Sequence, residues 1–209
     1  RLYYKDFAQI PFYAPEVKEQ DKIATFLGTV EQKISQLEKK RELLTHYKKG
    51  VMQQIFNQQI RFREDDGKDF PDWEENKLGD FCRLFKGKGI SRGELDAGGT
   101  LACITYGELY TKYGAVIESA DSRTRVRPSE LVLSKAGDVI IPASGESAID
   151  IATCACVLKD GVALGGDLNI IRGDFDGRFL SYYLRSAMKL ALARLAQGVS
   201  VVHLYGAQL

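Results

Sequence analysis

Hydrophobic side chains recur at a regular spacing between Val17 and Gln59, in two rows that each repeat every seven residues. A member of the second row follows a member of the first by four positions. This 4-3 spacing gives a helix a narrow apolar stripe, as in the seam of a coiled coil. The pattern predicts a long helix over residues 15–60. The predicted seam consists of Ile23, Leu27, Val30, Ile34, Leu37, Leu44, Val51 and Ile55.

Two cations interrupt this seam, because Arg41 and Lys48 stand where earlier repeats have Leu27 and Ile34. Either their aliphatic stems cover the seam while the charged heads reach water, or they mark where the helix meets a charged partner. A helix of about 40 residues is roughly 60 Å long and has no core of its own. We therefore expect it to pack on a second helix, from another subunit or from a further part of the protein. The alternative is that the helix lies across its own globular domain.

The helical pattern is lost after residue 57. Residues 61–72 contain two turn motifs, Asp65-Asp66-Gly67 and Phe70-Pro71-Asp72, and are predicted to form a linker. From Trp73 onward, short β-type runs alternate with glycine-rich turns, which predicts a globular domain over residues 73–209. The predicted strands cover residues 81–85, 101–106, 115–117, 131–133, 138–141, 151–158 and 168–172, and a last strand or loop covers 199–204. One helix is predicted over residues 177–197, with Gly198 as its stop.

The fold class that follows is α+β: a long helix of the coiled-coil type, then a domain with a mixed or mostly antiparallel sheet. Residues 1–14 are rich in aromatic and strand-prone side chains, and Pro11 and Pro15 bracket a short extended piece. We interpret residues 1–14 as the tail of a preceding domain. Because the chain begins at Arg1 rather than at Met, we expect it to be part of a longer protein.

The net charge of the 209 residues is only +1, which does not favour binding of nucleic acid through bulk charge. Positive charge is nevertheless concentrated locally. Between Arg83 and Arg92 there are four cations and no acidic residue. Farther on, Arg123, Arg125 and Arg127 alternate with other residues, so that a strand would place all three on one face. For each single cation, an ordinary solvated surface is the alternative interpretation.

Sequence motifs of catalysis are missing, and we predict that the chain is not an enzyme. There is no nucleophile motif with a nearby histidine, no Walker loop, no complete dinucleotide fingerprint and no adenine-methylation motif. The spacing of Cys82, Cys103, Cys154 and Cys156 fits no zinc site, and we expect free thiols in a reducing compartment, the cytoplasm. No run approaches the roughly 18 apolar residues that cross a bilayer.

Several glycine-flanked loops carry residues that suit DNA. Cations on the loop at 86–92 are able to reach phosphates or guanine edges. Tyrosines at 106–113 are able to pack on sugars or donate to phosphates, with core packing as the alternative for each of them. The small polar loops at 144–147, 165–167 and 197–200 allow a close approach of the DNA backbone. The predicted DNA-binding residues are Lys86, Lys88, Ser91, Arg92, Tyr106, Tyr110, Lys112, Ser144, Ser147, Gln197 and Ser200.

Three motifs in combination resemble the specificity (S) subunit of type I restriction–modification enzymes, a family of bacterial defence systems. They are PEVKEQDKIA at residues 15–24, YKKGVMQQIF at 47–56 and WEENKLGD at 73–80. The runs at 86–92 and 103–110 look like the start of a target recognition domain of that family, and residues 198–201 look like the end of one. The full subunit of the family has two recognition domains and two long antiparallel helices, so this chain resembles its second half.

The resemblance implies that the recognition domain reads one part of a split double-stranded DNA target, while a helix pair sets the distance to the other part. The helix pair also docks the methylation (M) subunits. S-adenosylmethionine, ATP and Mg are expected on the M and restriction (R) subunits, and no cofactor on this chain. The second helix would come from the other half of the subunit or from a second copy, paired antiparallel. The competing interpretation is a structural adaptor, whose coiled-coil helix and α+β domain bind other proteins.

Overall fold

The computed structural model describes residues 3–198 and 202–204. The chain divides into two compact units, Arg1–Gly50 and Val51–Leu209. Within the described residues, no helix is both long and apolar enough to span a membrane.

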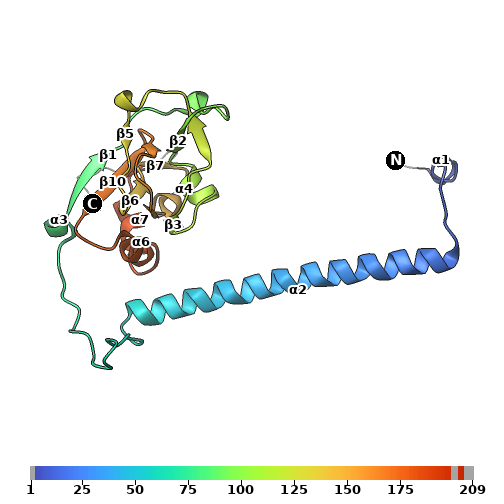
Figure 1. Ribbon diagram of the computed structural model, residues 1–209, viewed down its shortest axis with the longest axis horizontal. Coiled ribbons are helices and arrows are strands. Elements are labelled where there is room, and N and C mark those ends of the chain that lie inside the picture. The colour runs from blue at the N-terminus through green and yellow to red at the C-terminus, as the bar shows by residue number, and fades with distance from the viewer. Residues whose placement is uncertain (1–2, 199–201, 205–209) are drawn as a thin grey trace. The chain divides into compact units, whose positions relative to one another are not determined.

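The first unit consists of a short helix, α1 (Tyr4–Phe7), and most of the long helix α2 (Val17–Phe56). Figure 1 shows α2 without a break, as the heptad pattern predicts. Gln20 donates from Nε2 to the carbonyl of Pro15 at 2.7 Å and so holds the start of the helix. From Ile23 to Leu44 the seam side chains are 40–56% exposed. The seam in this unit is therefore an open apolar stripe.

The strand-like structure predicted for the first residues is wrong at Tyr4–Phe7, which form α1. The amide of Phe7 donates to the carbonyl of Tyr3, and the amide of Ala8 donates to that of Tyr4. In a helix these backbone N–H and C=O groups bond to each other, whereas in a strand they would need a neighbouring strand as a partner.

The second unit begins with the last turns of α2, where the seam residues Val51 and Ile55 are half-buried. The ring of Phe56 packs edge-on against Phe179 at 6.0 Å and against Tyr183 at 5.3 Å between centroids. Trp73, at the far end of the connecting segment, packs against the same Phe179 at 5.9 Å. This aromatic cluster joins the end of α2 and the start of the domain to one helix of the domain.

Three sheets form the described part of the domain, and the two larger ones are mixed, as predicted. The largest is ordered β1 (Cys82–Lys86), β10 (Leu168–Gly173), β6 (Asp138–Pro142), β8 (Ala155–Val157), β3 (Val116–Ile117), with only β3–β8 parallel. The second is ordered β4 (Ser122–Thr124), β2 (Leu101–Ile104), β9 (Ala163–Leu164), β5 (Val132–Leu133), with only β2–β9 parallel. The third pairs β7 (Ser144–Gly145) with β11 (Val202–His203).

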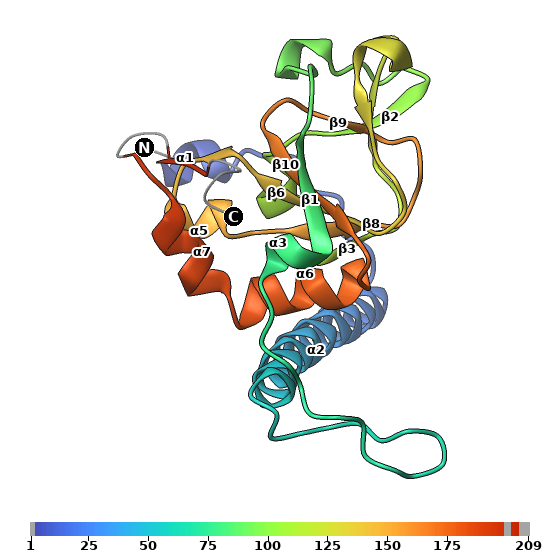
Figure 2. The same cartoon turned by 90° about the vertical axis from the view of Figure 1, so that its left-hand side faces the viewer.

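The helices α5 (Ala148–Ile151), α6 (Gly177–Ser186) and α7 (Lys189–Leu195) cover one face of the five-stranded sheet (Figure 2). Successive side chains of β6 point to opposite faces of the sheet, as they do in any β-strand. Val139 and Ile141 pack with the helices, while Ile140 packs in the cluster shared with the four-stranded sheet. Short helices α3 (Leu78–Phe81) and α4 (Glu108–Thr111) and the 3-10 turns η1 (Arg92–Glu94) and η2 (Pro128–Glu130) complete the domain.

Two predicted elements differ from the structure. The single helix predicted over 177–197 is wrong, because it breaks between Ser186 and Lys189, where the amides of Ala187 and Met188 both donate to Tyr183. The break lets Leu192 of α7 be buried in the core, although the sequence has helical residues throughout. The helix also ends at Leu195, before Gly198.

The strand predicted over 151–158 begins only at Ala155, and α5 precedes it. Ser147 caps α5, since its hydroxyl accepts from the amide of Asp150 at 3.2 Å. The spacing Ser147-x-x-Asp150 is typical of the start of a helix. The apolar residues that follow it resemble a strand, and for that reason a strand was predicted here.

The start of α6 has a similar cap, formed by Asp176. Its carboxylate accepts from the amides of Arg178 at 2.8 Å and Phe179 at 3.1 Å. The guanidinium of Arg178 and these amides lower the pKa of Asp176 to about 2. The cap therefore stays charged, and hence intact, down to strongly acidic pH.

Candidate nucleic-acid interface

The loop that follows β1 is fastened to a second loop, residues 164–169, by backbone hydrogen bonds. The amide of Gly87 donates to Leu168 and that of Lys88 donates to Leu164, both at 2.9 Å. In return, the amide of Gly166 donates to Gly89 at 2.7 Å. The backbone under the basic residues is therefore held in one conformation.

Glycine is required at two places in this contact. A Cβ at Gly87 would overlap the carbonyl oxygen of Gly165 and lie 2.7 Å from that of Leu164. Gly89 has φ +64°, and Ile90 after it has φ +55°. Ile90 is only 5% exposed, so its side chain anchors this unusual backbone in the core. The glycines of the KGKGI run thus allow two loops to touch, which neither composition nor spacing indicated.

The basic residues of this loop are exposed and remain unpaired within the described chain. Lys86, Lys88 and Arg92 take part in none of the ion pairs among the described residues. Ser91 is also exposed, and its amide donates to the carboxylate of Glu94 at 2.6 Å. That bond lowers the pKa of Glu94 and fixes the turn η1, on which Arg92 lies.

The alternating arginines are engaged within the protein. Arg125 pairs with Asp96 at 2.6 Å, and Arg127 pairs with Glu130 at 2.9 Å. Arg123 donates to the carbonyl of Thr100 at 3.3 Å. Only Arg123 belongs to a strand, because β4 ends at Thr124, so the prediction of three arginines on one strand face is wrong.

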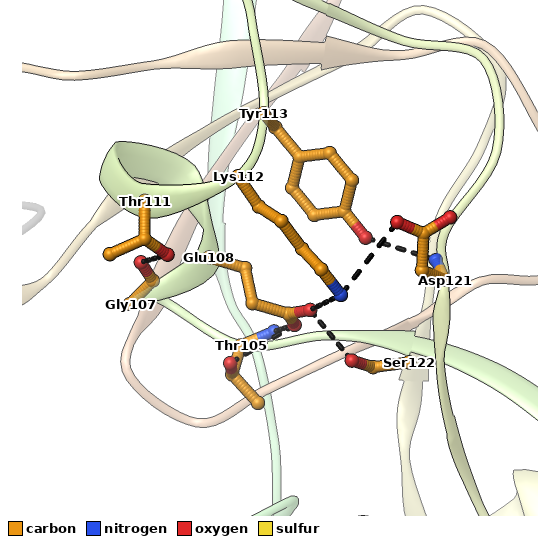
Figure 3. A network of polar contacts seen from close by, with 8 residues as sticks. All are labelled: Thr105, Gly107, Glu108, Thr111, Lys112, Tyr113, Asp121 and Ser122. Carbon is orange, nitrogen blue, oxygen red and sulfur yellow. Dashed lines mark hydrogen bonds and ion pairs between the residues drawn. The ribbon is translucent and has the colours of Figure 1, made fainter. Parts of the chain in front are cut away.

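The tyrosine-containing loop is organised by a partly buried acid, Glu108, rather than by its tyrosines. The carboxylate of Glu108 accepts from the amide of Thr105 at 2.9 Å and from the hydroxyl of Ser122 at 2.7 Å (Figure 3). Lys112 lies 3.3 Å from Glu108 and 3.7 Å from Asp121. Lys112 is therefore neutralised by two carboxylates and differs from the unpaired lysines of the loop at 86–92.

The tyrosines are partly structural. Tyr113 accepts a hydrogen bond from the amide of Asp121 at 3.0 Å, and Tyr106 packs on the core between the sheets. The rings of Tyr106 and Tyr110 lie 6.4 Å apart. Burial raises the pKa of Tyr110, and the negative charge of Glu146 contributes to the shift.

The loops at 144–147 and 197–200 meet through His203. The hydroxyl of Ser144 lies 3.2 Å from Nδ1 of His203, and the backbones of Gln197 and His203 exchange hydrogen bonds of 2.9 and 2.7 Å. Ser144 is buried and Ser147 is occupied as the cap of α5, whereas Gln197 is exposed. The predicted residue Ser200 lies outside the described residues.

Residues 164–169 form a hub that is bonded to the loop at 86–92 and to residues beside the other loops. Their run Gly165-Gly166-Asp167 is predicted to be a small polar loop that allows a close approach of DNA, but none of residues 164–169 is among the predicted DNA-binding residues. Two further backbone hydrogen bonds hold this hub. The amide of Ala143 donates to the carbonyl of Asp167 at 2.7 Å, and the amide of Gly165 donates to the carbonyl of Ile104 at 3.0 Å. The buried side chain of Asn169 donates to Leu204 at 2.9 Å. The hub thus joins the loop at 86–92 to Ile104, Ala143 and Leu204, which are separated by up to about a hundred residues in the chain.

The chemistry of the domain gives no support for a metal site. No group of three or more His, Cys, Asp or Glu side chains within the described ranges could hold a metal ion. The four cysteines are free thiols, and three of them are buried. Burial raises the pKa of Cys103 to about 11 and that of Cys154 to about 12, so both thiols stay protonated and unreactive at neutral pH.

Solved structures with a similar arrangement include the type I restriction–modification S subunit from M. genitalium. It matches 65% of this chain and 32% of its own length, at 13% identity and a TM-score of 0.45. The HsdS subunit from Thermoanaerobacter tengcongensis matches 91% of this chain and 47% of its own, at 16% identity and a TM-score of 0.49. A chain from a structure of complex assembly and conformational transition in the type I system matches 93% and 50%, at 16% identity and a TM-score of 0.44.

Each of these neighbours comes from a type I restriction–modification system. This is the family that the motifs at residues 15–24, 47–56 and 73–80 resemble. The chain spans between a third and a half of the length of the neighbours. No protein-family model and no curated protein matches the chain.

Proposed function

We propose that this chain is the second half of a specificity subunit of a type I restriction–modification complex. In this proposal the domain recognises one part of a bipartite double-stranded DNA target. The helix α2 pairs with an antiparallel helix, sets the distance to the other part of the target and docks the M and R subunits. The observation that carries the proposal is the hub at residues 164–169, which is bonded to the loop at 86–92 and to Ile104, Ala143 and Leu204, residues close in the chain to the other predicted loops.

The hub supports recognition of DNA because sequence can be read only by side chains that are held in fixed positions. The unpaired cations at Lys86, Lys88 and Arg92 supply local attraction for phosphates, although the net charge of the chain is only +1. Lys112, Ser144 and Ser147 are engaged within the protein, so in the proposal they position the loops. Tyr106, Tyr110 and Gln197 remain candidates for direct contact.

The proposal assigns no catalysis to this chain. Methylation and cleavage would be carried out by the partner subunits in the cytoplasm, with S-adenosylmethionine, ATP and Mg bound there. The support is chemical, since the sequence offers no motif for any of these groups.

The adaptor remains a second candidate, because the open seam between Ile23 and Leu44 is suited to a protein partner. The two proposals differ in the response of binding to salt. A domain that binds duplex DNA through phosphates loses affinity steeply as salt rises, whereas an adaptor would show no binding to duplex DNA at any salt concentration.

Replacing Lys86 by alanine is expected to reduce the dependence of duplex DNA binding on salt. If Lys86 contacts one phosphate, the slope of log K against log salt falls in magnitude by about one, equally for all sequences. The slope is measured by fluorescence anisotropy with labelled duplexes over a range of KCl. Arg127→Ala is the matched control, because it removes a cation of the same domain that is already paired with Glu130. An unchanged slope for Lys86→Ala, with the loss confined to one base pair, would assign Lys86 to a base instead.

A further inference from the structure

Asp167 is exposed, whereas the other residues of the hub at 164–169 are buried or half-buried. Its carbonyl accepts from the amide of Ala143 at 2.7 Å, and the amide of the preceding Gly166 donates to the carbonyl of Gly89 at 2.7 Å. The backbone that carries Asp167 is thus bonded to the loop of unpaired cations on one side and to the segment after β6 on the other. Its exposed carboxylate therefore starts from a fixed position.

The side chain of Asp167 has no part in holding the described fold. Among the described residues it takes part in no ion pair and no hydrogen bond. An aspartate that favours a turn accepts from a backbone amide two residues ahead, as Asp96 does from Gly98 at 2.7 Å. The turn at Asp167 is closed instead by its backbone, since the amide of Leu168 donates to the carbonyl of Gly165 at 3.1 Å. Neither ion pairing nor turn formation accounts for a carboxylate here.

A carboxylate beside unpaired cations has one favourable place against duplex DNA. The cations of the loop at 86–92 attract phosphates, and phosphates repel a carboxylate. In the major groove, cytosine presents the N4 amino group as a donor, from which Asp or Glu accepts. Guanine and thymine present acceptors there, and adenine presents the acceptor N7 beside its amino group. A carboxylate is therefore matched to cytosine and repelled by acceptor atoms of the other three bases.

We propose that Asp167 reads a cytosine in the major groove of the DNA target by accepting from its N4 amino group. The cations of the loop at 86–92 hold the phosphates beside it. The inference rests on the proposed function and adds to it a specificity-determining residue and the base that this residue selects. Because the backbone of the hub is bonded from two sides, the carboxylate meets the same base position in every complex.

The test compares the duplexes that are selected from random DNA by the full-length chain, co-purified with a methylation subunit, and by its variant Asp167→Ala. The variant is expected to lose the preference for cytosine at one position, by at least about fivefold, and to keep the rest of the motif. Its affinity for unrelated duplexes is expected to rise, because a negative charge near the phosphates is removed. A variant that had merely loosened the hub would lose affinity for all duplexes.

Asp174→Ala is the matched control. Asp174 is also an exposed aspartate, but it follows the other end of β10, roughly 20 Å from Asp167 along the strand. Its replacement removes the same charge from the same domain and should leave the selected motif unchanged.

A second measurement removes the amino group from the DNA instead of the carboxylate from the protein. At the position identified by the selection, cytosine is replaced by 2-pyrimidinone, which lacks only the N4 amino group. The replacement is expected to weaken binding by the original chain at least about fivefold more than binding by Asp167→Ala, as a pair in direct contact requires. Any weakening of the base pair itself affects both proteins equally and cancels in this comparison.

An unchanged motif for Asp167→Ala, a preference lost at an A·T pair, or an equal loss at every position would each overturn the assignment of cytosine to Asp167. Equal weakening of the two proteins by 2-pyrimidinone would overturn it as well. In all of these cases the original chain still selects a motif, and the proposed function stands. If the original chain selects no motif, the proposed function fails and this inference fails with it.

Discussion

Replacement of Asp138 by alanine is expected to lower the free energy of unfolding by about 3–5 kcal/mol, because it leaves a partly buried guanidinium without its counter-charge. Asp138 is only 1% exposed. Arg172 donates to its two carboxylate oxygens at 2.7 and 2.6 Å, and the amide of Lys135 donates to it at 2.8 Å. Arg172 also lies over the ring of Phe85, 5.1 Å from its centroid. The contacts of Arg172, which lies on β10, thus link three adjacent strands: the ion pair reaches β6 and the contact with Phe85 reaches β1.

The loss is measured by urea denaturation, with Glu130→Ala as the control. Glu130 pairs with Arg127 at 2.9 Å, but the two side chains are 55% and 84% exposed. Removing an exposed pair is expected to cost less than about 1 kcal/mol. Equal losses for the two variants would show that the Asp138–Arg172 pair contributes no more than an ordinary surface ion pair.

The second large effect is expected for Gly87→Ala. The added methyl group would overlap the carbonyl oxygen of Gly165, and both atoms belong to loops whose backbones are hydrogen-bonded. The contact must open, at a cost of about 1–3 kcal/mol in stability. Because Lys86 and Lys88 flank Gly87, we expect affinity for duplex DNA to fall by at least about tenfold as these side chains move.

Gly114→Ala is the matched control for this prediction, since no atom lies within 4 Å of a Cβ at that position. It introduces the same methyl group and should leave both folding and DNA binding unchanged. Anisotropy with the same labelled duplexes compares the two variants, and thermal unfolding monitors their stability. DNA binding by Gly87→Ala at the original affinity would contradict the role given to the contact between the two loops.

Local pattern predicted the elements that depend on local chemistry. The heptad spacing gave α2, and alternating apolar runs gave β1, β2, β6 and β10 to within a few residues. Ser147 and Asp150 mark the start of α5, yet the apolar run after them favoured a strand, and the tertiary contacts of α5 decided against it. The break before α7 was not predicted from the sequence, and the helix beyond it buries Leu192 in the core.

The sequence predicted which types of residue form the candidate site, but not which acidic side chain pairs with which cation. The spacing of Glu108 and Lys112 is that of a helical ion pair, so the neutralisation of Lys112 could have been inferred. The pairing of Arg125 with Asp96, and the lack of an ion pair for Lys86 among the described residues, could not be inferred, because the fold decides which acid comes near which cation. The bonds of the hub at 164–169 could not be predicted for the same reason, since they join segments far apart in the sequence, although residues 165–167 are recognisable as a small polar loop.

The most direct test of the central proposal is co-purification of this chain with a methylation subunit, followed by selection of bound duplexes from random DNA. We expect a stable complex that enriches a split motif with a fixed gap. The absence of both a complex and any enrichment of duplex DNA would contradict it and favour the adaptor.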